Sequence, residues 1–384
     1  MSKSRGPHWI GTMAALCACA KATAPALDPG DAAGVADTAP ALDAASALDA
    51  AQSDAALPAA DAAETSPPTC GTLEGTLRLH QLQAKATHNS YHIAQPLVPE
   101  LDYAHEPLDV QLQDQGVRSF ELDIHPPDEA PGPLQVYHLP AIDQTSNCGN
   151  FQECLTVLRK WSDAHPCHHT LLVIIEPKDQ LVDTGVEHEK LPLDDYWDQF
   201  DAEILAAWPR ARVIAPDDVR GAHPDLRAAV TTEGWPTMAA ARGKIALFLM
   251  DNHGHGAWYK KGHDGLKGRM AFVFGPGDAT DTAAVQFDNV KTPEDVAAVQ
   301  ALVKQGFLVR SFADGKVTAA GPNDLTIQQR ALESGAQMLS TDYPVPRARV
   351  PGYVFTLPGG TPSRCNPVNA PPGCKSSDVE NLGP

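Results

Sequence analysis

The chain has 384 residues, of which 43% are hydrophobic and 6% aromatic, and its net charge is −19. No stretch reaches the roughly 18–20 uninterrupted apolar residues that a membrane-spanning helix needs, so the sequence predicts no integral membrane protein. The acidic balance argues against a nucleic-acid partner, because phosphate contacts need clustered lysines and arginines. An acidic protein that binds an anionic substrate needs a local positive charge, such as a metal ion, to compensate the negative charge of that substrate.

The first 19 residues have the pattern of an export signal. Lys3 and Arg5 precede a short apolar run over residues 9–18, which ends in small residues. The junction Leu16-Cys17-Ala18-Cys19 resembles a bacterial lipobox, in which the final cysteine is lipidated and becomes the first mature residue. We therefore expect an exported protein, either a cell-envelope lipoprotein anchored at Cys19 or, after ordinary cleavage at an alanine, a secreted protein.

Residues 20–68 are predicted to be a disordered linker. These 49 residues contain 20 alanines, eight acidic residues, six prolines, one lysine and no aromatic residue. Such a composition cannot bury enough apolar area to offset the entropy of ordering. The folded domain is accordingly assigned to residues 69–384.

Six cysteines follow Cys19, and an even number in an exported chain suggests disulfides. Cys148 with Cys154, and Cys365 with Cys374, would close short local loops, which leaves Cys70 for Cys167. Zinc is the alternative, but the chain offers no CxxC spacing to support it.

Short apolar runs alternate with helical patterns through the rest of the chain. The predicted strands are residues 84–88, 119–125, 134–138, 170–176, 244–250, 270–274, 307–312 and 337–341. Helical patterns cover residues 151–161, the segment from Thr292 to Gly306, and residues 324–335. Eight nearly continuous apolar strands with helices between them predict a (β/α)₈ TIM barrel of the α/β class, with a doubly wound open sheet as the alternative.

Chemically active side chains gather where the first four predicted strands end. They are His88 and Asn89, then Glu121 and Asp123, then His138, and finally Glu176 and Lys178. Catalytic residues of a barrel lie at this end of its strands, so we expect the active site here.

Four of these residues predict a metal site. Glu121 and Asp123 are two apart on a strand and therefore share a face. Glu176 comes from the predicted strand after next, and we expect it in the same layer because alternate strands fill one layer of a barrel interior. With the amide oxygen of Asn89 they form an all-oxygen set that suits Ca²⁺ or Mg²⁺.

A histidine-rich loop follows the fifth predicted strand. Its residues are Asp251-Asn252-His253-Gly254-His255, with His263-Asp264 beyond. Its glycines favour a loop on the substrate side over a second metal site.

Several of these elements together resemble phosphoinositide-specific phospholipase C, and in particular its bacterial and fungal Ca²⁺-dependent members. The resemblance covers about residues 80–375. It is carried by His88-Asn89-Ser90-Tyr91, Glu121-Leu122-Asp123, Val136-Tyr137-His138, the strand ending at Glu176, Leu308-Val309-Arg310, Ser334-Gly335-Ala336-Gln337, Ser340-Thr341-Asp342-Tyr343 and Arg364-Cys365-Asn366-Pro367.

The resemblance implies a phosphodiesterase barrel with catalytic His88 and His138. It implies Ca²⁺ as cofactor, with ligands Asn89, Glu121, Asp123 and Glu176. Lys178 and Arg310 are candidates for phosphate contact, and a packing role is the alternative for each.

The implied reaction cleaves phosphatidylinositol-type lipids to diacylglycerol and a cyclic inositol phosphate, through attack by the inositol 2-hydroxyl. We expect a monomer that meets this lipid at a membrane surface and binds no nucleic acid. A glycerophosphodiester or sphingolipid substrate on the same barrel is the alternative, and a non-catalytic surface-anchored binding module is a further one.

Overall fold

The structure is a computed structural model. It describes residues 70–95, 101–129, 131–178, 193–314, 325–346, 352–359 and 362–380, which all belong to the compact unit Thr65–Pro384. The predicted export signal and the predicted linker lie outside the described residues.

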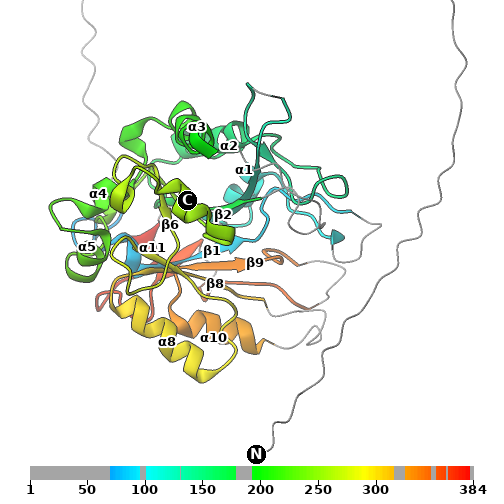
Figure 1. The fold of residues 1–384 in the computed structure, drawn as a ribbon. Coiled ribbons are helices and arrows are strands. Elements are labelled where there is room, and N and C mark those ends of the chain that lie inside the picture. Colours follow the sequence, from blue (N-terminus) through cyan, green and yellow to red (C-terminus); the bar gives the residue numbers. More distant parts are fainter. Residues whose placement is uncertain are drawn as a thin grey trace, which may run out of the picture. The chain divides into compact units, whose positions relative to one another are not determined.

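Eight parallel strands form a nearly closed barrel, which confirms the predicted (β/α)₈ fold (Figure 1). The strands are β1 (Leu82–Thr87), β2 (Ser119–His125), β4 (Leu171–Pro177), β5 (Ile245–Leu249), β6 (Ala271–Val273), β7 (Ala284–Gln286), β8 (Leu308–Phe312) and β9 (Met338–Thr341). Their order is β6-β5-β4-β2-β1-β9-β8-β7. A parallel bridge between Phe274 and Ala284 brings the two ends of this sheet together.

One predicted strand is not part of the barrel, and one barrel strand was not predicted. The run 134–138 contributes only β3 (Gln135–Val136), which pairs antiparallel with the end of β2 outside the barrel path. The barrel strand that was not predicted is β7, whose three residues Ala284-Val285-Gln286 contain only two apolar ones, too few for a recognisable pattern. A further short strand, β10 (Ser363–Cys365), pairs antiparallel with β1.

The position of β4 corrects the argument made from alternate strands. β2 and β4 are direct neighbours, and Asp123 lies opposite Glu176 in their register. Between β2 and β4 the chain leaves the barrel to form β3 and a helix, so these two barrel strands are distant in sequence but adjacent in the sheet. The carboxylates therefore meet across one pair of strands.

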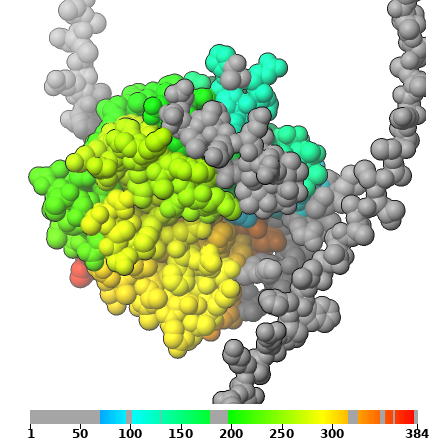
Figure 2. All heavy atoms as spheres, in the orientation of Figure 1, coloured from blue at the N-terminus to red at the C-terminus, as the bar shows by residue number. Residues whose placement is uncertain are grey.

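Helices surround the barrel and follow the sequence signals where those are strong. They are α1 (Leu108–Gln113), α2 (Phe151–Ala164), α3 (Leu193–Ala207), α4 (Pro216–Arg220), α5 (Leu226–Thr232), α6 (Met238–Ala241), α7 (His255–Tyr259), α8 (Pro293–Lys304), α10 (Thr326–Ser334) and α11 (Ser376–Val379). Thr292 caps α8 through the backbone N–H of Asp295, with Pro293 in the first helical position. Figure 2 shows the yellow segment that includes α8 forming the lower part of the near face.

Two neighbouring barrel strands, β4 and β5, carry continuous apolar runs because they are covered on both faces. Residues 171–175 of β4 and all of β5 are completely buried. Among the described residues, no helix has both the length and the apolar character to cross a bilayer.

Three disulfides link Cys70 to Cys167, Cys148 to Cys154 and Cys365 to Cys374, as predicted. The first joins residues 97 apart in sequence and fixes the start of the domain beside the segment before β4. Three disulfides in one domain fit an exported protein.

Candidate active site

Three carboxylates converge at the carboxyl end of β2 and β4. One oxygen from each of Glu121, Asp123 and Glu176 lies within 4.8 Å of the others. Glu121 and Asp123 are almost completely buried, at 1% and 0% exposure. The strand geometry is the cause, because residues two apart project to the same side and Glu176 is level with Asp123 on the next strand.

Asn89, the fourth predicted ligand, lies two residues after the end of β1. Its backbone adopts a φ of 46°, a left-handed conformation that asparagine tolerates better than most residues. Its amide nitrogen donates to the hydroxyl of Tyr103 over 3.1 Å. Its amide oxygen is buried and accepts no hydrogen bond within the part of the chain that the structure describes.

These residues fit a calcium ion. Oδ1 of Asp123, like the Asn89 oxygen, is buried without a hydrogen-bond donor among the described residues. Burial, and after it the charge of Glu176, raises the pKa of Asp123 well above its usual value. Clustered acceptor oxygens whose charges repel one another are stabilised by a hard cation, and Ca²⁺ takes carboxylate and carbonyl oxygens.

Two cationic side chains contact the carboxylate cluster. Nζ of Lys178 lies 3.0 Å from both Oδ2 of Asp123 and Oε1 of Glu176. Nη2 of Arg310 donates to Oε2 of Glu121 over 2.5 Å, and the arginine is completely buried. Each predicted phosphate contact thus forms an ion pair with a predicted metal ligand.

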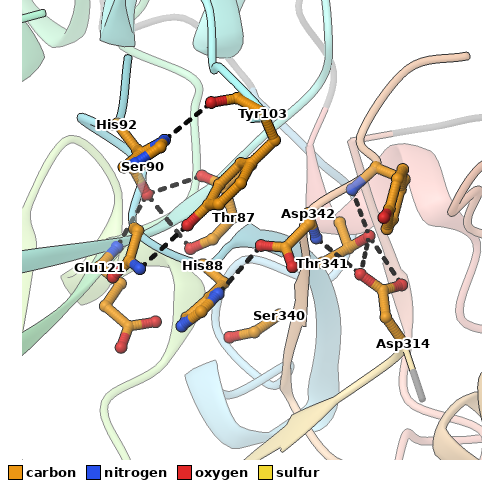
Figure 3. Close-up of polar contacts among 12 residues, drawn as sticks. Thr87, His88, Ser90, His92, Tyr103, Glu121, Asp314, Ser340, Thr341 and Asp342 are labelled. Atoms are coloured by element: carbon orange, nitrogen blue, oxygen red, sulfur yellow. Dashed lines mark hydrogen bonds and ion pairs between the residues drawn. The ribbon is translucent and has the colours of Figure 1, made fainter. Parts of the chain in front are cut away.

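His88 forms one of two histidine–aspartate pairs at this mouth of the barrel. Its Nδ1 lies 2.9 Å from Oδ1 of Asp342, which follows β9 (Figure 3). Burial alone would lower the pKa of His88, but the charges of Asp342 and Glu121 outweigh it and raise the pKa to about 9. His88 therefore carries two ring protons at neutral pH and can donate from Nε2.

Asp314 supports this pair from behind. Its carboxylate accepts hydrogen bonds from the hydroxyl of Thr341 at 2.8 and 2.9 Å and from the backbone N–H of Asp342 at 2.6 Å (Figure 3). The hydroxyl of Tyr353 donates to it over 2.7 Å. Burial, followed by the charge of Asp342, raises the pKa of Asp314 to about 7.

His138 forms the second pair. It follows the antiparallel strand β3, and its Nδ1 lies 3.0 Å from Oδ2 of Asp143. The ring is 21% exposed. Burial, with the charge of Lys178 next in importance, lowers its pKa.

The loop after β5 lies against the cluster. Asn252 donates its amide to Oε1 of Glu176 over 3.2 Å. A cavity of about 530 Å³ adjoins this loop and is lined in part by Asp251, Phe274 and Asp288. Among the described residues, neither His253 nor His255 belongs to a group of side chains that could hold a metal ion.

Sequence patterns did not reveal the residues that hold the two histidines. Asp143, Asp314 and Asp342 lie in loops or just past strand ends, where acidic residues are common and no spacing marks them. The one available signal was the position of Asp342, directly after a strand that ends at this mouth.

Comparison with known proteins identifies the family. Residues 128–367, more than half of the chain, match the family described as "Phosphoinositide phospholipase C, Ca2+-dependent". The chain belongs to this family. No curated protein matches the chain at a significant level.

Solved structures of this phospholipase C family share the fold. A Ca²⁺-dependent phosphoinositol-specific phospholipase C from Pseudomonas sp. has a TM-score of 0.54 at 17% identity, covering 76% of this chain and 96% of its own. The corresponding enzyme from Streptomyces antibioticus has a TM-score of 0.51 at 20% identity, covering 70% of this chain and 95% of its own. At these identities the similarity establishes the barrel, and the roles of individual residues are argued from the site itself.

Proposed function

We propose that this phospholipase C is a Ca²⁺-dependent phosphodiesterase that cleaves phosphatidylinositol-type lipids to diacylglycerol and a cyclic inositol phosphate. The observation that carries the proposal is the meeting of an all-oxygen cluster and two histidine–aspartate pairs at one barrel mouth. The Pseudomonas enzyme, whose structure is titled a myoinositol complex, supports an inositol headgroup.

The ligands of the proposed cation are Asn89, Glu121, Asp123 and Glu176. The chemistry that Ca²⁺ supplies when bound is a lower pKa for the inositol 2-hydroxyl and compensation of charge on the phosphoryl oxygen. A carboxylate of the cluster, Glu121 or Glu176, takes the proton of the 2-hydroxyl.

The two histidines act on the phosphate and the leaving group. His88, doubly protonated beside Asp342, donates from Nε2 to a phosphoryl oxygen and stabilises the charge that develops there. His138 keeps Nδ1 towards Asp143, so its Nε2 can protonate the glycerol oxygen as the bond to phosphorus breaks. As negative charge develops on the phosphate, Lys178 and Arg310 are proposed to exchange their carboxylate partners for the phosphate oxygens.

A product assay tests the proposal directly. The full chain is incubated with phosphatidylinositol, glycerophosphoinositol or sphingomyelin, with and without a chelator, and the products are followed by phosphorus NMR. We expect a cyclic inositol phosphate from phosphatidylinositol in Ca²⁺ alone. Phosphocholine or ceramide phosphate from sphingomyelin, with phosphatidylinositol untouched, would overturn the proposed substrate class.

We further propose that the enzyme is exported, anchored through Cys19 and carried on the linker of residues 20–68. The 49-residue linker would have a root-mean-square reach of roughly 35–42 Å, from about 5–6 Å times the square root of the residue number. Anchoring on such a linker keeps the barrel mouth at high effective concentration near a bilayer, so the barrel itself needs little affinity for lipid.

Replacing the anchoring cysteine should release the enzyme. Cys19→Ser is expected to move folded protein from the membrane fraction to the soluble fraction, with turnover of a short-chain substrate retained. Cys17→Ser is the matched control and should remain membrane-bound. Mass spectrometry of the mature N-terminus decides the question, since an unlipidated first residue on native, already soluble protein would contradict the anchor.

A further inference from the structure

His92 is a buried histidine with two acceptors and no assigned role. It lies in the turn after β1, is completely buried, and stacks on Tyr103 with ring centroids 4.1 Å apart. Its Nδ1 lies 2.8 Å from the backbone carbonyl oxygen of Tyr103, a contact visible in Figure 3. Its Nε2 lies 2.8 Å from Oδ2 of Asp143. Both ring nitrogens therefore face oxygen acceptors.

Counting protons fixes the charge of this pair. A neutral imidazole carries a single N–H, and the carbonyl of Tyr103 can only accept, so that proton resides on Nδ1. The contact between Nε2 and Asp143 therefore requires a second proton, whether it lies nearer the nitrogen or the oxygen. In both cases His92 and Asp143 together carry no net charge, which is the state that full burial favours.

The same carboxylate oxygen holds the catalytic ring. Oδ2 of Asp143 is 3.0 Å from Nδ1 of His138 as well as 2.8 Å from His92. Asp143 is completely buried, so no solvent screens it. We propose that His92 is a positioning residue of the reaction: it shares a proton with Asp143, so that Asp143 orients His138 without presenting it a net negative charge.

The other histidine–aspartate pair of the site differs in burial. The side chains of His88 and Asp342 are 30% and 32% exposed, whereas those of His92 and Asp143 are completely buried. Burial first, and then the charge of Lys178, lowers the pKa of His138, which suits a proton donor better than a permanent cation.

The groups that face His138 define the test. They are Asp143, His92, Lys178 and the neutral ring of His125, whose pKa burial lowers to about 3. His125 is completely buried and stacks on Tyr137 with ring centroids 3.6 Å apart, as His92 stacks on Tyr103, but its Nε2 faces a backbone carbonyl oxygen rather than a carboxylate.

The experiment is an NMR titration of the His138 ring in the full chain, without substrate, with and without Ca²⁺. His92→Gln should leave Asp143 a net anion and raise the pKa of His138 by about one unit. Asp143→Asn should change that pKa little, because the pair is neutral before and after, yet should lower kcat because the ring is no longer oriented. His125→Gln is the control and should not move the titration.

Several outcomes would overturn the inference. One is an unchanged His138 titration in His92→Gln; another is a fall of about one unit in Asp143→Asn, which would show that Asp143 acts as a full anion. In the unaltered protein, each of the two bonds of His92 should show a slowly exchanging proton, and a freely exchanging site would also contradict the inference.

A bound metal is the remaining alternative for this cluster. His92, His138 and Asp143 are side chains of the kinds that bind zinc. A stoichiometric transition metal whose removal changes the His138 ring signals would overturn the shared proton. The inference rests on the proposed role of His138, but the titration needs no substrate, so failure of the lipid assay and failure here are distinguishable.

Discussion

Replacing His138 by alanine should slow cleavage of phosphatidylinositol by roughly 10²–10⁴-fold, the range for loss of a general acid. The glycerol oxygen is a poor leaving group unless it is protonated as its bond to phosphorus breaks. A substrate with a nitrophenol leaving group needs no such proton, so His138→Ala should lose far less on it. The measurement is kcat/KM of the variant and the unaltered enzyme on both substrates.

His88→Ala provides the comparison within the same site. Its bond to the phosphoryl oxygen is needed whatever group leaves, so this variant should be slow on both substrates. Equal losses for His138→Ala on the two substrates would remove His138 from the acid role. Circular dichroism of each variant controls for folding, which neither change should disturb, because both rings are partly exposed at the barrel mouth.

The carboxylate cluster could be predicted from sequence because local geometry determines most of it. Glu121 and Asp123 share a face by strand periodicity alone, and Glu176 lies near the end of a strand with a nearly continuous apolar run. The prediction was right about which end of the barrel they share, although β4 proved to be the neighbour of β2. All parallel strands of the barrel have their carboxyl ends at the same mouth, so the predicted location of the cluster is right even though the predicted strand order was wrong.

The parts of the site that the sequence did not reveal depend on contacts between distant segments. Asp342 meets His88 across 254 residues, and His92 meets Asp143 across 51. No periodicity links such positions, since loops bring them together only after the barrel has formed. The same limit explains why β7 was missed and why the pairing of β3 was not predicted. The three residues of β7 and the two residues of β3 contain too few apolar positions to reveal which strand each one pairs with.

Removing divalent cations should abolish turnover, and Ca²⁺ should restore it better than Zn²⁺ because the four proposed ligands are all oxygens. Asp123→Asn should weaken Ca²⁺ binding, measured by calorimetry, while leaving the metal-free protein folded. Asp163→Asn, a change at a 48% exposed carboxylate on α2, is the control and should bind Ca²⁺ normally. Full activity after exhaustive chelation would rule out the site.

Stability measured against pH gives an independent readout of the same cluster. Because the pKa of Asp123 is raised in the folded protein, the unfolded chain loses that proton first as pH increases. The metal-free protein should therefore lose stability as pH rises through the folded pKa, since ionisation then forces a buried charge next to Glu176. Excess Ca²⁺ should remove this loss, because ligand binding to the folded state adds RT ln(1 + [Ca²⁺]/Kd). Thermal melts over pH, with and without Ca²⁺, measure the effect, and Asp123→Asn should flatten the metal-free curve. A metal-free melting temperature that rises over the same interval would show that the carboxylates are stabilised by Lys178 and Arg310 alone and do not await a cation.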